Sequence, residues 1–359
     1  MSLSTSIPTG TPPFRVLIVR TGAMGDVLHA MPAVAAMRLL HPEWTIGWAI
    51  EPRWRALLEG RSGGHEVRPL VNLIHEVPTR DWNRRPLSPE TLREILALRR
   101  ELSSEKYNLC VDMQGLFRSA VVGRLASADS YAGSAQPRET PARWLYGKTI
   151  ETQAPHVIDR GCELLGRAIG ETLRAAEVPL PVDEDAERWC EAALATLVPD
   201  KQFVVLAPTA GWGSKCWPAE RYGALAGALH DAGYAVLINA ASENDPAAAA
   251  VARASEGHAL PVACTLPQLM ALLRRSAMLI AGDTGPLHLA AALGRPVIGL
   301  YGPTDPRRTG PYGPNGHVLR HPSSQTDHRR HSEPEAGLNR ITVDEVRQAA
   351  LAVLEDKAA

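Results

Sequence analysis

The sequence predicts an α/β protein built from two doubly wound, Rossmann-like domains in series, each with a parallel sheet. Short apolar runs alternate with helical patterns along most of the chain, which is typical of strand–helix–strand units. An apolar strand followed by a glycine-containing loop begins at Phe14, and the same pattern begins again at Phe203. The length of 359 residues is about twice the ~100–200 residues of a single domain, so two domains are expected.

The first domain begins with the apolar run Phe14–Arg20, which ends in the loop Thr21–Asp26 and continues as a helical pattern over Val27–Leu40. This succession of strand, tight loop and helix is the usual start of a doubly wound domain. A buried strand is expected at Tyr107–Met113, and its carboxyl end brings Asp112 to the edge of the sheet. The other elements expected in this half are a strand at Thr45–Ile50 and helices at Leu92–Glu105, 117–126 and 156–169.

The segment Glu177–Asp183 contains two prolines and is the best candidate for a linker. We therefore expect an N-terminal domain over residues 1–178, a C-terminal domain over 179–340 and a final helix within 341–359. The elements expected after the linker are strands at Phe203–Ala207, Ala235–Asn239, Met278–Ala281 and Val297–Tyr301, and helices at Ala219–Ala232, Leu266–Arg275, Pro286–Leu293 and Val343–Leu354.

The composition excludes several classes of protein. Hydrophobic residues make up 45% and charged residues 21% of the chain, which indicates a soluble globular protein and not a disordered one. A net charge of −1 gives no basic surplus for nucleic acid. No run reaches the ~18–20 consecutive apolar residues of a membrane span. The five cysteines form no Cys-x-x-Cys motif, which fits a cytoplasmic protein without zinc or disulfides.

Two segments of the chain show no clear pattern of helices or strands. Residues 1–13 lack the apolar segment of a signal peptide, so we expect a frayed leader there. Residues 303–340 are rich in Pro, Arg, His and Ser and are expected to be mostly loop.

Positive charge is concentrated in the first half of the chain. Residues 1–180 contain 22 lysines and arginines against 19 acidic residues, whereas residues 181–359 contain 16 against 20. Twenty of the 22 cations in the first half are arginines, whose planar forks suit phosphate and carboxylate groups. For any single arginine, a solvated helix face is the more common explanation.

The loop Thr21–Asp26 holds two glycines, Gly22 and Gly25, and lacks both the three-glycine dinucleotide fingerprint and the lysine of a P-loop. Asp26 can cap the following helix by accepting bonds from its free N–H groups. It can instead act as a general base, because it is held on a rigid element at the expected cleft. His29, on the same helix face, either pairs with Asp26 or packs as a surface histidine.

The segment Gly282–Ala291 follows a buried strand and reads as the start of a helix. Asp283 and Thr284 are capping residue types, and the free N–H groups of such a helix start bind anions. Gly285 would let a phosphate approach the backbone closely. His288, one turn into the helix, is either a buried core histidine or a ligand contact, and its surroundings favour the contact.

The loop Pro208–Pro218 also lies between a strand and a helix. Its small residues expose backbone donors near Ser214, and Lys215 supplies a point charge for phosphate. A lone loop lysine is usually only solvated, but this loop and the Asp283 segment are expected at the same edge of one sheet. A third such segment, Tyr301–Pro306, reads as a turn when taken alone.

Taken together, these segments resemble the heptosyltransferase family, which transfers heptose from ADP-heptose to the lipopolysaccharide inner core. The resemblance covers nearly the whole chain and is strongest at Arg15–Pro32, Lys215–Pro218 and Gly282–Pro306. The segments Asp112–Ser119 and His156–Arg160 look most like those of heptosyltransferase I.

The resemblance implies the GT-B architecture, with an N-terminal acceptor domain, a C-terminal nucleotide-sugar domain and a last helix that packs back on the first domain. It implies an inverting reaction in which Asp26 is the general base. By the same matching, Ser214, Lys215, Asp283, Thr284, Gly285 and His288 bind the donor. Glu243 is the candidate for the acid that contacts the donor ribose.

The implied donor is ADP-heptose, and no metal is expected to be obligatory because none of the loops expected to bind the donor contains an Asp-x-Asp motif. The implied acceptor, Kdo-bearing lipid A, is an anionic lipid-linked saccharide, so peripheral contact with the inner membrane is compatible with the sequence. The candidates for binding this acceptor are Gly22, Arg53, Arg84, Arg85, Arg118, Arg138 and Arg160.

The chain departs from heptosyltransferase I in two loops. Gly22 and Ala23 stand where that branch has hydroxyl residues, and Ala210 and Gly211 stand where it has two threonines. Alternatives are therefore a related enzyme using another nucleotide-sugar, either a transferase or an epimerase, and a non-catalytic nucleotide-sugar-binding homologue. A Rossmann dehydrogenase is disfavoured by the missing glycine fingerprint.

Overall fold

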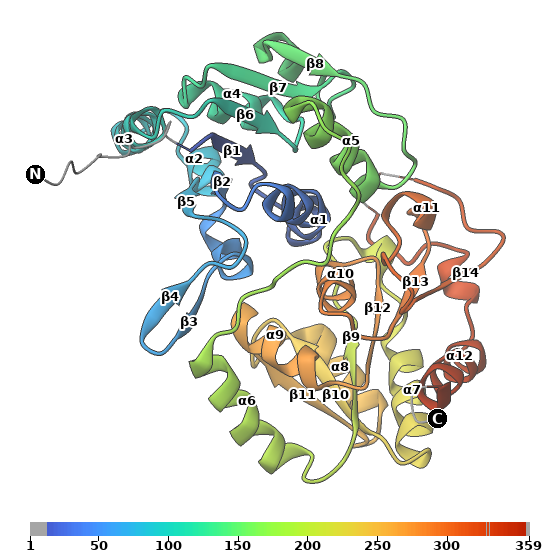
Figure 1. Cartoon of the computed structure of the whole chain (residues 1–359). Coiled ribbons are helices and arrows are strands. Elements are labelled where there is room, and N and C mark those ends of the chain that lie inside the picture. The colour runs from blue at the N-terminus through green and yellow to red at the C-terminus, as the bar shows by residue number, and fades with distance from the viewer. Residues whose placement is uncertain (1–12, 328, 330, 357–359) are drawn as a thin grey trace, which may run out of the picture.

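The computed structural model describes residues 13–356 apart from residues 328 and 330 (Figure 1). The expected leader lies almost entirely outside these residues. The described chain forms two six-stranded sheets, and every strand pair within them is parallel. Helices cover both faces of each sheet, as a parallel sheet requires. The predicted α/β class with two doubly wound domains is confirmed, and no helix of the described residues is long and apolar enough to cross a membrane.

The N-terminal sheet has the strand order β5-β2-β1-β6-β7-β8. Its central strand forms because Val16–Val19 is a continuous apolar run that is buried on both faces. The strands are β1 (Arg15–Val19), β2 (Thr45–Ile50), β5 (Leu73–Glu76), β6 (Leu109–Asp112), β7 (Ser130–Ser134) and β8 (Lys148–Ile150). The helices are α1 (Met24–Leu40), α2 (Thr79–Arg84), α3 (Pro89–Ser104), α4 (Phe117–Leu125) and α5 (Val157–Ile169), with the short turns η1 (Pro52–Leu57) and η2 (Thr140–Leu145) and the hairpin β3 (Gly60–Ser62) and β4 (His65–Val67).

The C-terminal sheet repeats this topology with the order β11-β10-β9-β12-β13-β14. Its strands are β9 (Phe203–Ala207), β10 (Ala235–Ala240), β11 (Ala259–Ala263), β12 (Met278–Gly282), β13 (Val297–Tyr301) and β14 (Gly316–Arg320). Its helices are α6 (Glu184–Leu197), α7 (Ala219–Asp231), α8 (Pro246–Ala254), α9 (Leu266–Arg275), α10 (Gly285–Ala292), α11 (Pro306–Thr309) and α12 (Val343–Asp356), with η3 (Gly213–Lys215) and η4 (Leu338–Arg340).

Each sheet has a switch point where the strand order reverses, between β1 and β6 in the first and between β9 and β12 in the second. Ligands of doubly wound folds bind beyond the carboxyl ends of the strands at such points. Asp26 follows β1 and Asp283 follows β12, so the topology alone places both carboxylates at the two switch points.

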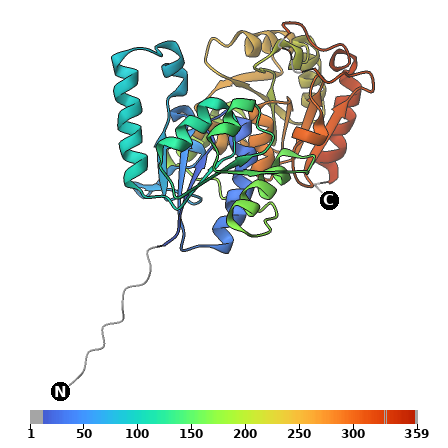
Figure 2. The same ribbon diagram turned by 90° about the horizontal axis from the view of Figure 1, so that it is seen from above.

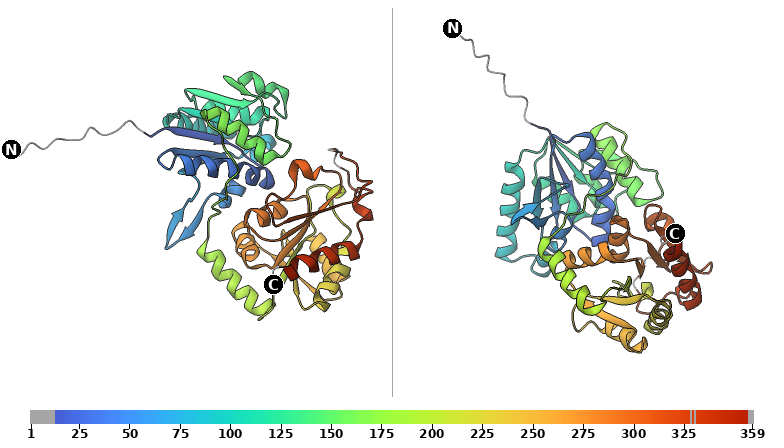
Figure 3. Two further views of the ribbon diagram at one scale, coloured as in Figure 1. Left: turned by 45° about the vertical axis from the view of Figure 1, so that its right-hand side comes forward. Right: turned by 60° about the horizontal axis from the view of Figure 1, so that its bottom comes forward.

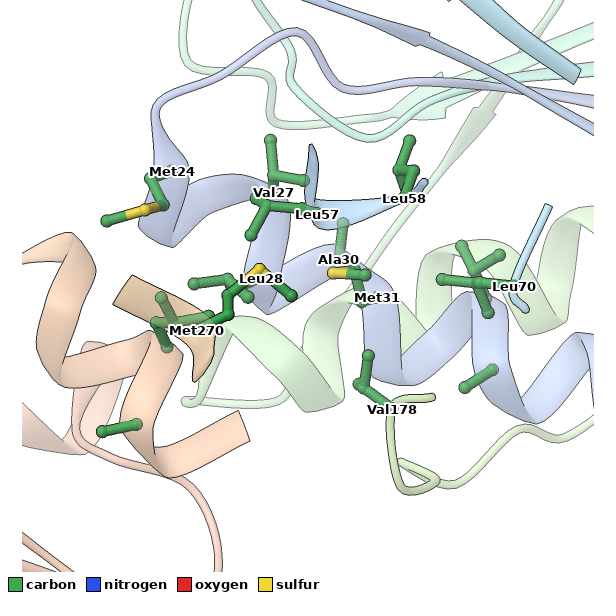
Figure 4. Packing of buried hydrophobic residues seen from close by; sticks show 14 of the residues in the cluster. Met24, Val27, Leu28, Ala30, Met31, Leu57, Leu58, Leu70, Val178 and Met270 are labelled. Carbon is green, nitrogen blue, oxygen red and sulfur yellow. The ribbon is translucent and has the colours of Figure 1, made fainter. Parts of the chain in front are cut away.

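The two domains meet where α1 packs on α10 and α9. Met24 and Leu28 of α1 belong to the same buried apolar cluster as Met270 of α9 (Figure 4). A Cβ on Gly285 would lie 2.2 Å from the Met24 methyl, and one on Gly25 would lie 2.8 Å from the His288 ring. At Gly25, where the added atom would collide with the buried His288 ring, glycine lets the two helix starts approach this closely.

The chain passes from the first sheet to the second through residues 170–183, and the last helix packs within the C-terminal domain. Val346, Ala350 and Leu354 of α12 are buried in the same apolar cluster as Tyr222 of α7. Figure 3 shows α12 lying beside α7. The implied return of this helix to the N-terminal domain therefore does not match the structure.

The elements differ from the predictions at two main places. Helix α1 begins at Met24, three residues earlier than expected. Residues 303–340 are mostly loop, as expected, but they also contain the short elements α11, β14 and η4, which were not predicted. The edge strand β14 was missed because only two of the five residues in GHVLR are large and aliphatic.

Candidate active site

Asp26 lies in the first turn of α1, and arginines hold its carboxylate from two sides. Arg138 donates two hydrogen bonds, from Nη1 to Oδ2 at 2.9 Å and from Nη2 to Oδ1 at 2.7 Å. Arg20 Nη2 lies 2.9 Å from Oδ1, and its Nε donates to the Asp26 carbonyl oxygen at 3.0 Å. The N-cap of α1 is Ala23, and every hydrogen bond to this carboxylate from the described residues comes from an arginine. The capping interpretation of Asp26 is therefore wrong.

The positive charges of Arg20 and Arg138 keep the Asp26 carboxyl ionised. Burial alone would raise the pKa of Asp26, but the positive charges of Arg20 and Arg138 outweigh it and hold the pKa well below its ordinary value. Asp26 is thus ionised at every physiological pH. The two arginines differ in their surroundings, because the Arg20 side chain is 8% exposed and the Arg138 side chain is 43% exposed.

A cavity of about 240 Å³ opens beside Asp26 within the N-terminal domain and the edge of the C-terminal domain. Four arginines line it: Arg20, Arg138, Arg160 and Arg308. Arg160 is fixed by two hydrogen bonds from its guanidinium to the Ala154 carbonyl oxygen, at 3.1 and 2.9 Å. Such a concentration of cations in one cavity suits a ligand that carries several anionic groups.

The wall of this cavity is held by Asp112 at the end of β6. Its Oδ1 accepts hydrogen bonds from the backbone N–H groups of Gln114 and Gly115, at 2.8 and 3.1 Å. Its Oδ2 accepts from the hydroxyls of Ser119 and Tyr146, at 2.9 and 2.8 Å. Burial raises the pKa of Asp112. The satisfied carboxyl shapes the loop and is not exposed for chemistry.

A second carboxylate, Asp283, lies at the carboxyl end of β12. Lys215 Nζ donates to its Oδ2 at 2.7 Å, and its Oδ1 lies 3.0 Å from His288 Nε2. Burial alone would raise the pKa of Asp283, but the bond from His288 and the charge of Lys215 hold it well below its ordinary value. The Asp283 and His288 side chains are 7% and 6% exposed, so this cluster is rigidly enclosed.

Two buried hydroxyls lie on the loops that carry this cluster. Neither Ser214 Oγ nor Thr284 Oγ1 has a hydrogen-bond partner among the described residues. Thr284 is the N-cap of α10, and its side chain makes no cap bond. Buried hydroxyls without partners are costly, and a bound ligand would satisfy them. The loop and the helix start therefore offer hydroxyl, ammonium and backbone donors to an anion.

Histidines connect the two clusters across the domain interface. The rings of His29 and His288 meet edge to face with centroids 4.3 Å apart, and His156 lies 6.2 Å from His29. His29 is 8% exposed and its Nε2 has no hydrogen-bond partner among the described residues, so it is neither a surface histidine nor hydrogen-bonded to Asp26. Burial holds the pKa of His29 well below its ordinary value.

Comparison with known proteins identifies the family and the fold. The model of glycosyltransferase family 9 (heptosyltransferase) matches residues 95–338. Lipopolysaccharide heptosyltransferase 1 of Escherichia coli K12 is 31% identical over 316 residues, which are 86% of this chain and 94% of that protein. The Pseudomonas aeruginosa heptosyltransferase 1 is 29% identical and covers 83% of this chain and 81% of its own length.

The chain belongs to glycosyltransferase family 9. Among solved structures, the E. coli heptosyltransferase WaaC with ADP superposes with a TM-score of 0.76 at 27% identity, covering 95% of this chain and 100% of that one. A family 9 glycosyltransferase from Veillonella parvula superposes with a TM-score of 0.80 at 18% identity, which supports the fold alone. The GT-B architecture expected from the sequence is confirmed.

Within this glycosyltransferase, the structure brings together only some of the expected acceptor residues. Arg138 and Arg160 line the cavity at Asp26. Gly22 packs against the Trp54 indole, and the Arg53 guanidinium lies 4.0 Å from the centroid of that same ring. Arg53 and Gly22 thus form a neighbouring group outside the residues that line the cavity.

The other expected arginines lie elsewhere. Arg84 is 79% exposed with its nearest carboxylate, Asp81, at 3.7 Å, and Arg85 pairs with Glu90 at 2.7 Å. Arg118 is exposed on the first turn of α4 and does not line the cavity. Glu243 is exposed in the turn after β10, at the same sheet edge as Asp283.

Sequence reasoning missed Arg20 and Arg308. Arg20 ends an otherwise apolar strand at the edge where ligands bind, and that position was an available signal. Arg308 lies in α11, inside a segment expected to be loop, and nothing local distinguishes it from Arg307. The described residues contain no group of three or more His, Cys, Asp or Glu side chains arranged to hold a metal.

Proposed function

We propose that this glycosyltransferase moves heptose from ADP-heptose to a Kdo-bearing lipid A acceptor of lipopolysaccharide, with inversion at the anomeric carbon. Relatives at about 30% identity are named lipopolysaccharide heptosyltransferases, and WaaC was solved with ADP and with ADP-2-deoxy-2-fluoro heptose. The observation that carries the proposal is the pair of carboxylates at the two switch points, Asp26 beside four arginines and Asp283 beside Lys215.

Asp26 acts as the general base. The acceptor hydroxyl gives its proton to the Asp26 carboxylate as its oxygen bonds to the anomeric carbon, and the bond to the ADP oxygen breaks with its electron pair leaving on ADP. In the free enzyme the arginines weaken Asp26 as a base, because they stabilise its ionised form. An acidic acceptor that takes Arg138 for its own carboxylate would raise the pKa of Asp26 and strengthen the base.

The arginine-lined cavity receives the acceptor. Carboxylate and phosphate groups of a Kdo-bearing lipid A would bind Arg138, Arg160 and Arg308, whose guanidinium groups recognise such anions with two parallel bonds. Because Arg138 is half exposed and Arg20 is buried, Arg138 is the arginine that can exchange partners.

Lys215, Ser214, Thr284 and the start of α10 receive the donor diphosphate. Negative charge builds up on ADP as it leaves, and fixed donors placed there stabilise it without reorganisation. These groups would do the work for which other enzymes use a divalent cation, so we propose transfer that is independent of added metal. Glu243, at the same sheet edge, is the candidate for the donor ribose.

The acceptor is a lipid, so we propose that the enzyme works on the cytoplasmic side of the inner membrane and contacts the bilayer peripherally.

A transfer assay with ADP-heptose and Kdo-bearing lipid A, in the presence of EDTA, tests the proposal. We expect the glycoside and ADP as products, and a loss of kcat of about 10²–10⁴-fold in Asp26→Asn, with donor affinity within about threefold of wild type. Asp344→Asn is the matched control, since Asp344 also lies in the first turn of a helix but is 79% exposed. Undiminished transfer by Asp26→Asn would remove the assigned base.

UDP- and GDP-sugars in the same assay test the donor. Transfer from one of these in place of ADP-heptose would reassign the chain to a related transferase. Release of an epimer or a free sugar without a glycoside would favour an epimerase.

A further inference from the structure

We propose that one face of the N-terminal domain, over α3, α4 and η2, docks the enzyme on an anionic lipid bilayer. This inference rests on the proposed function, because it supplies the route by which a lipid-linked acceptor reaches Asp26. We call the surface the docking face. Its six apolar residues are Leu87, Leu92, Leu96, Phe117, Val121 and Trp144.

Large apolar side chains are exposed on this face to an unusual degree. Leu87, on the turn before α3, is 89% exposed, and Trp144 of η2 is 78% exposed. Leu92 and Leu96 are 54% and 50% exposed. Single exposed apolar residues need no explanation, but a gathering of them marks an interaction surface.

Helices α3 and α4 each carry exposed apolar residues one turn apart, on a side of the helix that does not face the core. Leu98 and Leu102 of α3 are buried against the core, while Leu92 and Leu96, one turn apart, form a second apolar stripe on the outside. On α4, Phe117 and Val121 are likewise one turn apart and outward. Helix α4 packs beside both α3 and η2, so the outward stripes lie on adjacent elements.

The charges around the face suit anionic lipid. Neither α4 nor η2 contains an acidic residue, and the three glutamates of α3, Glu90, Glu94 and Glu101, contact Arg85, Trp82 and His75 respectively. The arginines on the three elements that form no ion pair within the described part of the chain are Arg93, Arg99, Arg100, Arg118, Arg124 and Arg143. Exposed aromatic and leucine side chains set among unpaired arginines fit a bilayer interface with acidic headgroups, where the apolar groups insert and the guanidinium groups meet phosphate.

The docking face adjoins the acceptor cavity. The backbone N–H of Phe117 donates to Glu139 Oε2 at 2.7 Å, and the next residue back, Arg138, binds Asp26. A saccharide anchored in the bilayer beside Phe117 therefore has a short path to the base. Figures 1 and 2 place α3 on the side of the N-terminal domain away from the C-terminal domain, so the donor domain does not cover it.

Vesicle flotation with the full chain tests the inference, using phosphatidylethanolamine vesicles with and without phosphatidylglycerol. We expect wild type to float with the anionic vesicles and to lose binding as salt is raised, because charge contributes to it. Leu87→Ser/Trp144→Ser should bind at least about tenfold more weakly, since both side chains lose their apolar insertion. Arg124→Glu/Arg143→Glu should lose the preference for phosphatidylglycerol.

Leu39→Ser/Leu40→Ser is the matched control. These two leucines are 74% and 52% exposed, and they lie outside the docking face, at the end of α1 that is far from Asp26. Equal binding by the control and the Leu87/Trp144 variant would overturn the docking face. So would wild-type protein that ignores vesicles and instead self-associates through these residues in sedimentation velocity.

Transfer to a deacylated, water-soluble acceptor separates this inference from the proposed function. The Leu87/Trp144 variant should match wild type with that acceptor and fall behind only with the acceptor in vesicles. Wild type that binds vesicles through this face yet transfers no heptose would contradict the proposed function and leave the docking face standing.

Discussion

The two switch points of this molecule hold carboxylates in contrasting surroundings. Asp26 and Asp283 both follow a central strand, and both have a pKa held well below its ordinary value. Asp283 is bound by partners from its own domain, the buried His288 and the mostly buried Lys215. Asp26 is bound in part by Arg138, which is half exposed and lies beside an open cavity. From this difference we propose that the partners of Asp283 form a permanent scaffold, whereas Arg138 is a replaceable partner of Asp26.

Breaking the permanent cluster should have the larger effect on folding. Asp283→Asn leaves the Lys215 ammonium partly buried without its counter-charge, which costs about 3–5 kcal/mol of unfolding free energy when such a pair is broken. Urea unfolding at neutral pH measures this, and donor titration should show weakened binding in parallel. A variant as stable as wild type would contradict the scaffold role.

The loss of unfolding free energy in Asp283→Asn should become smaller at acidic pH. A carboxyl whose folded pKa lies below its unfolded pKa contributes stability above about pH 4, and that stability disappears as the pH falls through the folded value. The gap between wild type and Asp283→Asn should therefore narrow below about pH 4.

Removing the replaceable partner, Arg138, should weaken binding of the acceptor more than it lowers the stability of the fold. Arg138→Gln should lower the unfolding free energy by less than about 1 kcal/mol, since the ion pair is partly exposed. It should raise the KM for the acceptor about 10–100-fold, the cost of one charged hydrogen-bonding group. Arg84→Gln is the control, because Arg84 is exposed and away from the cavity. Equal changes of the acceptor KM in Arg138→Gln and Arg84→Gln would contradict a specific role of Arg138 in binding the acceptor.

The smallest effect concerns the histidine contact between the domains. Burial lowers the pKa of His29 in the folded state, so the unfolded chain binds a proton below about pH 6.5 that the folded chain does not. The free energy of unfolding should therefore decrease as the pH is lowered below about 6.5, because the unfolded chain takes up this proton and the folded chain does not. His29→Gln should flatten the slope of unfolding free energy between about pH 6.5 and 5.5. An unchanged slope would assign the effect to other groups.

The sequence was most informative where local chemistry and topology agree. Strands β2, β9 and β13 were predicted to the residue because each is a continuous apolar run. The loops bearing Asp26, Lys215 and Asp283 were predicted because glycine and small residues directly follow such strands. These signals are local, so one chain suffices to find them.

Features that depend on distant contacts were less predictable. Strand β7 and the edge strand β8 have few large apolar residues and are held by their neighbours in the sheet. Which arginines meet at one cavity depends on tertiary packing, so Arg84 and Arg118 were expected there and Arg20 and Arg308 were not. The burial of His29 likewise follows from α10, which lies far away in sequence.

The most direct test of the central claim is the titration of the Asp26 carboxyl by carbon NMR, with Asp26→Asn used for assignment. The titration is repeated with a water-soluble Kdo saccharide bound. In the free enzyme we expect Asp26 to stay ionised to well below the ordinary pKa of about 3.9. With the saccharide bound, the pKa should rise as Arg138 turns to the ligand. An unchanged or lower pKa in the complex would contradict the idea that the acceptor releases the base.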